Sequence, residues 1–246
     1  DVNRFQSTND IFPTALRIAA LRELALLERS LAELQQALQE REREFATILK
    51  LGRTQLQDAV PVTLGQEFGA WAEAVARDRW RIDKCRERLR LCNLGGTAVG
   101  TGTTAPKNFI FAFVEEVRTI TGLPLARAEN GVDVTQNADL FSEVSGMLRT
   151  VAVNYQKIAA DLRLLASGPT GGIGEIMLAP LQAGSTIMPG KVNPVMPELL
   201  ASVAIQVMGN DLAVNLAAAA GQLELNAFLP VLARNLLESV TLLGEA

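Results

Sequence analysis

The sequence predicts an all-α protein, a bundle of unusually long helices joined by polar loops. Apolar residues recur at helical spacing over long stretches, and most glycines and prolines fall between those stretches. No run alternates apolar with polar residues in the way that a half-buried strand would. Of the 246 residues, 48% are hydrophobic and 20% are charged, which supplies a large core and excludes a disordered chain.

The first predicted helix runs from Pro13 to about Leu49, and Asn9 or Asp10 can cap its start. Its leucines follow the 3-4 spacing of a coiled-coil seam: Leu24, Leu27, Leu31, Leu34 and Leu38. At 1.5 Å per residue such a helix would be roughly 55 Å long. A rod of this length needs partner helices or other subunits to cover its apolar faces.

The second predicted helix follows a loop from Arg53 to Pro61, with Gly52 ending the helix before it. Its single apolar seam is made by Leu64, Phe68, Trp71, Val75, Ile82, Cys85, Leu89 and Cys92. Residues 93–106 form a loop rich in glycine and threonine. A short helix is then expected from about Asn108 to Thr121.

Three more helices are predicted in the second half of the chain, over residues 132–166, 195–220 and 228–246. The segment from 167 to 194, rich in Gly, Pro, Ser and Thr, separates the first two of these. Because function is usually placed on loops held by a rigid scaffold, the polar loops are the segments to search for chemistry.

Composition excludes several classes of function. The net charge of −4 argues against a nucleic-acid surface, and the absence of histidine excludes histidine catalysis and histidine metal sites within these residues. No metal-ligand spacing, nucleotide-binding motif or uncharged apolar run long enough for a membrane span is present. Two cysteines, Cys85 and Cys92, are expected to stay unpaired, which suits a cytoplasmic protein. No cofactor and no metal are expected.

Three short polar segments remain as candidate functional sites: residues 6–10, 52–58 and 184–194. The first can be a plain helix cap or a cluster of hydroxyl and N–H donors for a carboxylate. The second can be the end of one helix, a polar loop and the start of the next helix. The third can be a mobile surface loop, or a lid that carries a reactive group beside a cation.

The third segment, Gly-Ser-Thr-Ile-Met-Pro-Gly-Lys-Val-Asn-Pro, resembles the signature G-S-x-x-M-P-x-K-x-N-P of the aspartase/fumarase superfamily. Residues 53–68 resemble the corresponding block of aspartate ammonia-lyases, and the segments at 95–102 and 161–169 also fit. The resemblance covers essentially the whole chain. It implies that residues 1–246 are the family's central helical domain, with the terminal domains absent. It also implies a homotetramer with a core of about twenty helices and active sites shared by three subunits.

The resemblance also implies residue roles in the binding of a small dicarboxylate substrate. Ser185 would be the general base, Lys191 and Asn193 would hold the α-carboxylate, and Thr186 would add a hydroxyl donor. The other carboxylate and the amino group would meet Ser7, Thr8 and Asn9. Thr54 and Gln55 would line the site, with Glu198 pairing with Gln55.

The expected reaction is the reversible deamination of L-aspartate to fumarate and ammonia. Removing the Cβ proton creates an aci-carboxylate with extra negative charge, which dense hydrogen-bond donors and helix N-termini stabilise. Many relatives have histidine where Gln55 stands, and glutamine cannot donate a proton in that way, which favours ammonia over hydroxide as the leaving group. The alternatives are a fumarate hydratase, another fumarate-forming lyase, or an inactive helical oligomerisation core.

Overall fold

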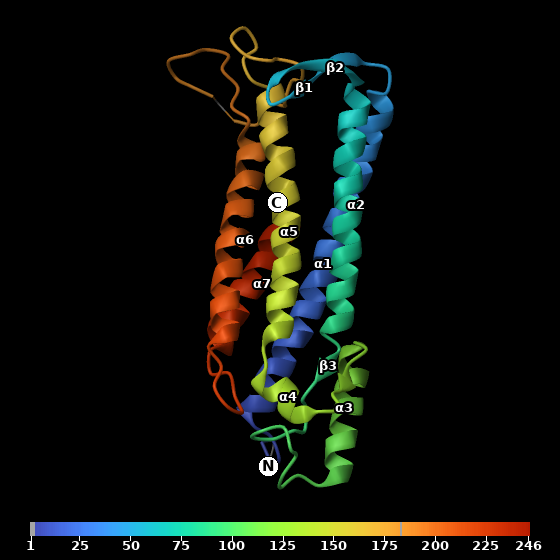
Figure 1. Cartoon of the computed structure of the whole chain (residues 1–246), viewed down its shortest axis with the longest axis vertical. Helices are drawn as coiled ribbons and strands as arrows, with labels where there is room; N and C mark the ends of the chain where they lie inside the picture. The colour runs from blue at the N-terminus through green and yellow to red at the C-terminus, as the bar shows by residue number, and fades with distance from the viewer. Residues whose placement is uncertain (1–2, 183) are drawn as a thin grey trace.

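The computed structural model describes residues 3–182 and 184–246, and the elements in them confirm the all-α class. Five long helices run side by side along one axis (Figure 1). They are α1 (Thr8–Glu44), α2 (Leu64–Arg88), α5 (Asp139–Leu165), α6 (Val195–Ala219) and α7 (Leu229–Glu245). The shorter α3 (Lys107–Thr121) and α4 (Gly131–Gln136) lie at the end of the bundle where α1 begins.

One continuous core runs along the bundle and joins all five long helices. The predicted leucine seam of α1 is inside it, with Leu24, Leu27 and Leu31 fully buried, and the predicted seam of α2 is buried over its whole length. Each fully buried leucine contributes about 1.5–3 kcal/mol relative to an exposed one. The bundle therefore holds its loops on a rigid frame.

The predicted end of the first helix is wrong, and so is the predicted loop after it. Helix α1 ends at Glu44, where the backbone N–H of Phe45 closes the last turn. The next residues form an antiparallel hairpin of β1 (Leu49–Thr54) and β2 (Gln57–Thr63). Two bonds fix its base on the helices: Gly65 N–H donates to the Phe45 carbonyl at 3.0 Å and Leu64 N–H to that of Ile48 at 2.9 Å. Cross-strand pairing over residues 49–63 thus overrides the local helical pattern.

Two further boundaries differ from the prediction. The second helix ends at Arg88, and the next residues form β3 (Leu91–Cys92), which pairs in parallel with β4 (Ala126–Arg127). The helix predicted over residues 132–166 is divided into α4 and α5. Asn137 is extended between them, and its side chain bonds back to Asp133 at 2.6 Å, which ends α4.

Helix α6 is the one helix in the described part of the chain with the length and hydropathy of a membrane span. It nevertheless packs against α5 and α7 and buries polar side chains. Buried Asp211 accepts hydrogen bonds from Ser145 at 2.7 Å and from Arg149 at 3.0 Å, both on α5. Such a satisfied polar contact is typical of a helix in a bundle.

Candidate active site

The first candidate segment lies at the N-terminus of α1. Ser7 is the N-cap: its Oγ accepts the Asn9 N–H at 3.1 Å, while Asp10 accepts the Ser7 N–H at 3.0 Å, closing a capping box. The segment is therefore a helix cap, as one of its two interpretations predicted, but the predicted cap residue is wrong: the cap is Ser7 rather than Asn9 or Asp10, because the helix begins at Thr8 and not at Pro13. Ser7 is half-buried, and its hydroxyl can still donate to an anion at this positive end of the helix dipole. Thr8 is exposed, and its hydroxyl donates to the Asn9 side-chain oxygen at 3.3 Å, a bond that it would exchange to reach an anion.

The second candidate segment is the tip of the hairpin. Thr54 pairs with Gln57, so Gln55 and Leu56 form a two-residue turn, and both have positive φ (52° and 60°). Two positive φ values are typical of a type I′ turn, which fits the twist of the flanking strands but usually takes asparagine and glycine. Thr54 and Gln55 are exposed at this tip and do not contact the rest of the bundle through any hydrogen bond in the described part of the chain.

The third candidate segment is a loop closed at its base. The Asn193 side chain donates to the Gly184 carbonyl at 3.4 Å, and Gly184 abuts Lys191 so closely that a Cβ would collide with the Lys191 carbonyl. Inside the loop the Ser185 Oγ accepts two backbone N–H groups, from Ile187 at 3.2 Å and Met188 at 3.1 Å. Two N–H groups aimed at one hydroxyl oxygen favour its negatively charged form.

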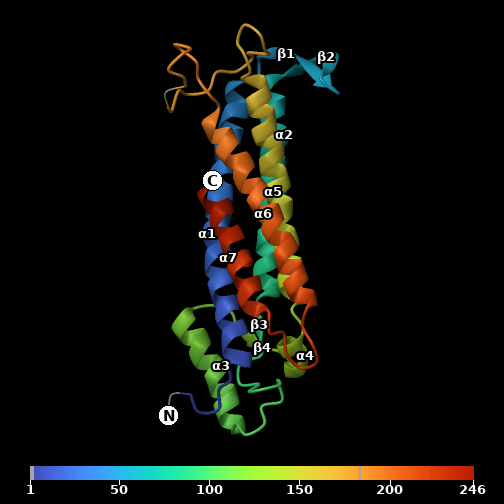
Figure 2. The same cartoon turned by 90° about the vertical axis from the view of Figure 1, so that its left-hand side faces the viewer.

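The structure brings the second and third segments to the same end of the bundle and places the first at the other end (Figures 1 and 2). Ser7 caps the start of α1, whereas the hairpin follows its end, and the 37 residues between span roughly 55 Å. Within one chain, Ser7, Thr8 and Asn9 therefore do not meet Ser185. A site that uses all three segments must combine different chains.

Glu198 was predicted to pair with Gln55, but within the chain it pairs with another residue. It lies in the first turn of α6, and its carboxylate is 3.8 Å from the Arg163 guanidinium, with both side chains about half exposed. Gln55 is at the hairpin tip and is not the partner of Glu198 in the described residues. No three His, Cys, Asp or Glu side chains in residues 3–182 and 184–246 lie close enough to hold a metal ion.

An ion-pair network that the sequence does not predict joins the hairpin to the loop after α5. The Glu175 carboxylate contacts Arg53 at 2.6 Å and Lys50 at 2.7 Å, and Lys50 also pairs with Glu67 of α2 at 2.7 Å. The Lys50 side chain is only 8% exposed. Nothing in the spacing of these residues predicts the pairing, because Glu175 is far from the others in the sequence.

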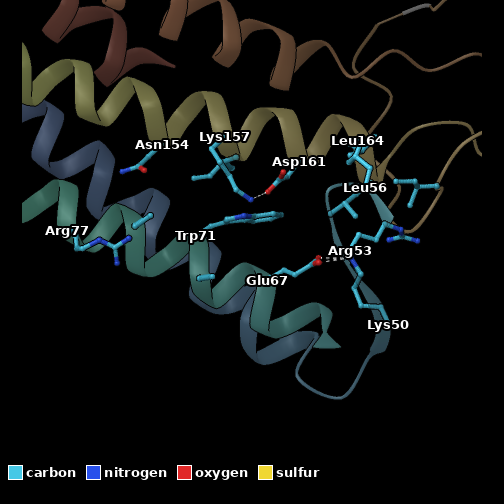
Figure 3. Close-up of a pocket in the computed structure, with 15 residues that line it drawn as sticks. Lys50, Arg53, Leu56, Glu67, Trp71, Arg77, Asn154, Lys157, Asp161 and Leu164 are labelled. Carbon is cyan, nitrogen blue, oxygen red and sulfur yellow. Dashed lines mark hydrogen bonds and ion pairs between the residues drawn. The ribbon is translucent and has the colours of Figure 1, made fainter. Parts of the chain in front are cut away.

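Three residues of this network, Lys50, Arg53 and Glu67, border a cavity of about 450 Å³ between α2 and α5. Figure 3 shows Trp71 lying across it, with the Lys157–Asp161 ion pair on one side and Glu67 on the other. Leu56, the second residue of the hairpin turn, also lines the cavity. None of the predicted site residues is among the side chains that line it, so this cavity within one chain does not contain the predicted site.

We expect Glu175→Gln to lower the free energy of unfolding at pH 7 by about 1–3 kcal/mol, because it removes the charge shared by two cations. Burial acts to raise the pKa of Glu175, but hydrogen bonds and charges from Lys50 and Arg53 outweigh it and hold that pKa below 4.5. The stabilisation is therefore complete above pH 4.5 and disappears as the pH falls through the lower pKa of the folded state.

Urea unfolding of both proteins at neutral and acidic pH checks this expectation. The difference between Glu175→Gln and the unmodified protein should be large at pH 7 and small at acidic pH. The matched control is Glu143→Gln, whose pair with Arg88 is largely exposed and should matter little at either pH. An equal loss for Glu175→Gln at both pH values would contradict the ion-pair explanation.

Comparison with known proteins shows the family of the chain. The model of a lyase family matches residues 1–209. The chain is 49% identical to the aspartate ammonia-lyase of Bacillus subtilis over 99% of its own length and 51% of that protein, and 46% identical to that of Escherichia coli over 100% and 51%. The chain thus spans about half the length of these curated relatives.

Solved structures show the same similarity. A fumarate lyase:delta crystallin from Brucella melitensis superposes with a TM-score of 0.97 at 49% identity, over 100% of this chain and 53% of that one. A class II fumarase from Schistosoma mansoni gives a TM-score of 0.94 at 36% identity, over 99% and 54%. The signature at residues 184–194, the helical bundle and these similarities agree, and the chain belongs to the lyase family of the aspartase/fumarase superfamily.

Proposed function

We propose that this chain is the catalytic bundle of an aspartate ammonia-lyase, which interconverts L-aspartate with fumarate and ammonia. The relatives that carry this name match almost the entire chain at close to half identity. The observation that carries the proposal is the geometry of Ser185, whose Oγ accepts two backbone N–H groups within a polar loop. A serine held in this way is suited to act as a base rather than as a surface hydroxyl.

In the proposed reaction, Ser185 takes the proton from Cβ of aspartate. The electron pair of the broken C–H bond moves into the adjacent carboxylate and forms an aci-carboxylate. When that electron pair returns, a C–C double bond forms, the Cα–N bond breaks and ammonia leaves. The Ile187 and Met188 N–H groups assist the first step because they stabilise the oxygen of Ser185 before it is protonated.

The remaining predicted residues supply binding in this proposal. Lys191 and Asn193 hold one carboxylate, with Thr186 as a further donor, while Ser7, Thr8 and Asn9 bind the other carboxylate and the amino group. The N-terminus of α1 adds its dipole to the second group. Thr54, Gln55 and Glu198 line the site from the hairpin tip and the first turn of α6. The proposal needs no cofactor or metal.

The proposed assembly is a homotetramer in which chains share each site, and two observations support it. The candidate segments lie at opposite ends of a long bundle, so a complete site needs more than one chain. Helix α6 also leaves several large apolar side chains exposed: Leu199, Ile205, Leu212 and Leu216. An exposed apolar helix face of this kind suits contact with another copy. The proposed compartment is the cytoplasm, where the free, buried Cys85 and Cys92 would stay reduced.

The test of the function is the ultraviolet absorbance of fumarate, measured with L-aspartate and then with L-malate, together with an assay for ammonia. We expect absorbance and ammonia to rise together with aspartate and neither to rise with malate. A rise with malate alone would make the protein a fumarate hydratase. Silence of the intact protein with both substrates would contradict the proposal and favour an inactive oligomerisation core.

A further inference from the structure

The glycine-rich segment at residues 95–103, to which the proposed reaction gives no role, lies against the N-terminus of α1. The contact is made through Asp10, whose side chain is completely buried. One carboxylate oxygen of Asp10 accepts the Gly95 N–H at 3.2 Å and the Thr97 N–H at 3.1 Å. The other accepts the Ser7 N–H at 3.0 Å. A single carboxylate therefore joins this loop to the first residue of the proposed substrate-binding segment.

Side chains on either side of Asp10 strengthen the same junction. The Asn9 amide donates to the Ala98 carbonyl at 2.7 Å, and the Asn93 amide donates to the Asn9 carbonyl at 2.9 Å. From the other side, Gly100 packs so tightly on Gly131 that a Cβ would collide with the Gly131 backbone. The loop is thus clamped between the start of α1 and the start of α4, and Asp10 is the charged group at its centre.

A carboxylate at the buried position of Asp10 is electrostatically unfavourable, so its presence there calls for a physical explanation. Burial raises the pKa of Asp10, and hydrogen bonds from the backbone of Ser7, Thr97 and Gly95 oppose that effect. A carboxylate next to Asn9 also repels a substrate carboxylate bound there, so its electrostatic effect on binding is unfavourable. What the carboxylate provides is geometry, because it is the one group that fixes three backbone N–H donors from two segments.

We propose that Asp10 is a positioning residue, which orients Ser7, Thr8 and Asn9 toward the substrate carboxylate by anchoring them to the 95–103 loop. The inference rests on the proposed function of this segment. It assigns Asp10 no contact with the substrate. It requires that loosening the junction weakens dicarboxylate binding more than it weakens the fold.

The experiment uses the intact protein, the variant Asp10→Asn and the matched control Asp78→Asn. Asp78 is also completely buried, but it lies in the middle of α2, where it accepts hydrogen bonds from Arg81 at 2.6 Å and Asn154 at 2.8 Å. For each protein we would measure the melting temperature, KM and kcat for aspartate, and the inhibition constant of succinate, a dicarboxylate that cannot eliminate ammonia.

We expect both variants to melt at lower temperature, and Asp10→Asn alone to raise KM and the succinate constant, each by about tenfold or more. Asparagine keeps one acceptor oxygen but turns an NH2 donor toward backbone N–H donors at the other position, so its side chain can no longer hold both segments. A purely structural role would lower the melting temperature and the active fraction without changing the succinate constant. If Asp10 acted only through its charge, Asp10→Asn would lower the inhibition constant of succinate, because a charge that repels the dicarboxylate would be removed.

A second measurement does not depend on the folding of any variant. Hydrogen exchange of the unmodified protein should slow in residues 93–103 when succinate is added, and should stay unchanged around Asp78. The absence of aspartate turnover in the unmodified protein would mean that the proposed function has failed. The inference itself is overturned if that protein turns over aspartate but succinate leaves the exchange of residues 93–103 unchanged, or if Asp10→Asn behaves like Asp78→Asn.

Discussion

Replacing Ser185 with alanine is expected to lower kcat for aspartate deamination by about 10²–10⁴-fold, the usual contribution of a general base. KM should change little, because the proposed carboxylate contacts come from other side chains. The fold should survive, since Ser185 lies in a loop outside the helical core and, among the residues that the structure describes, its Oγ bonds to its own loop, at Ile187 and Met188. Steady-state kinetics and a melting curve for the same preparation check these three expectations together.

Ser202→Ala is the matched control for this substitution. Ser202 is exposed near the start of α6, and its hydroxyl donates to the backbone carbonyl of Glu198 at 2.8 Å within the same helix. Its loss should leave kcat close to that of the unmodified protein. A Ser185→Ala variant that retains most of its kcat would show that another group removes the proton.

Lys191→Met is expected to raise KM for aspartate by about 10²-fold or more, because a substrate carboxylate loses its charged partner in a partly desolvated site. Lys191 is exposed in the loop, so its removal should not lower the melting temperature. The inhibition constant of succinate should rise by a similar factor, since the interaction is made with the ground-state dicarboxylate. Lys84→Met, on the outer face of α2, is the control.

A change in kcat alone would give Lys191 a different role. In that case the lysine would act only on the transition state, for instance by stabilising the charge that develops on the aci-carboxylate. The proposed contact with the bound carboxylate would then be wrong. An unchanged KM, an unchanged kcat and an unchanged succinate constant together would remove Lys191 from the site.

The long helices could be predicted because periodic burial decides them. Leu24, Leu27 and Leu31 follow one seam in the sequence and are fully buried in the structure, and the seam of α2 behaves likewise. The hairpin at residues 49–63 could not be predicted in this way. Its strands are short, most of their side chains are exposed, and their pairing depends on two segments that meet only after α1 has ended.

In the candidate site, the local features of each segment could be predicted from the sequence, but the contacts between distant segments could not. A helix cap within residues 6–10 followed from their residue types, although the cap is Ser7 and not Asn9 or Asp10, and the loop at Ser185 followed from its polar composition. The link between Glu175 and the hairpin did not, because no local pattern relates residues so distant in the chain. Asp10 was predicted as a possible helix cap, whereas the structure places it three residues after the cap, and its bonds to Gly95 and Thr97 required the structure. The roles of these residues in binding and catalysis stay predictions.

In the proposed assembly, each active site combines the start of α1 from one chain with the Ser185 loop of another. Thr8→Glu disables the first part: a glutamate in the first turn of a helix is compatible with folding but repels a carboxylate. Ser185→Ala disables the second part. Each variant alone should be nearly inactive. If they are co-assembled in equal amounts, random mixing should place both intact segments in about a quarter of the sites.

Aspartate turnover by this mixed assembly is the most direct measurement. We expect two nearly inactive proteins to regain about a quarter of the activity of the unmodified protein when they are assembled together, under the random mixing that a symmetric oligomer allows. The contrary result is a mixture that stays as inactive as its components. That result would mean that the Thr8 and Ser185 of one chain serve the same site, which the opposite ends of α1 do not allow in the structure described here.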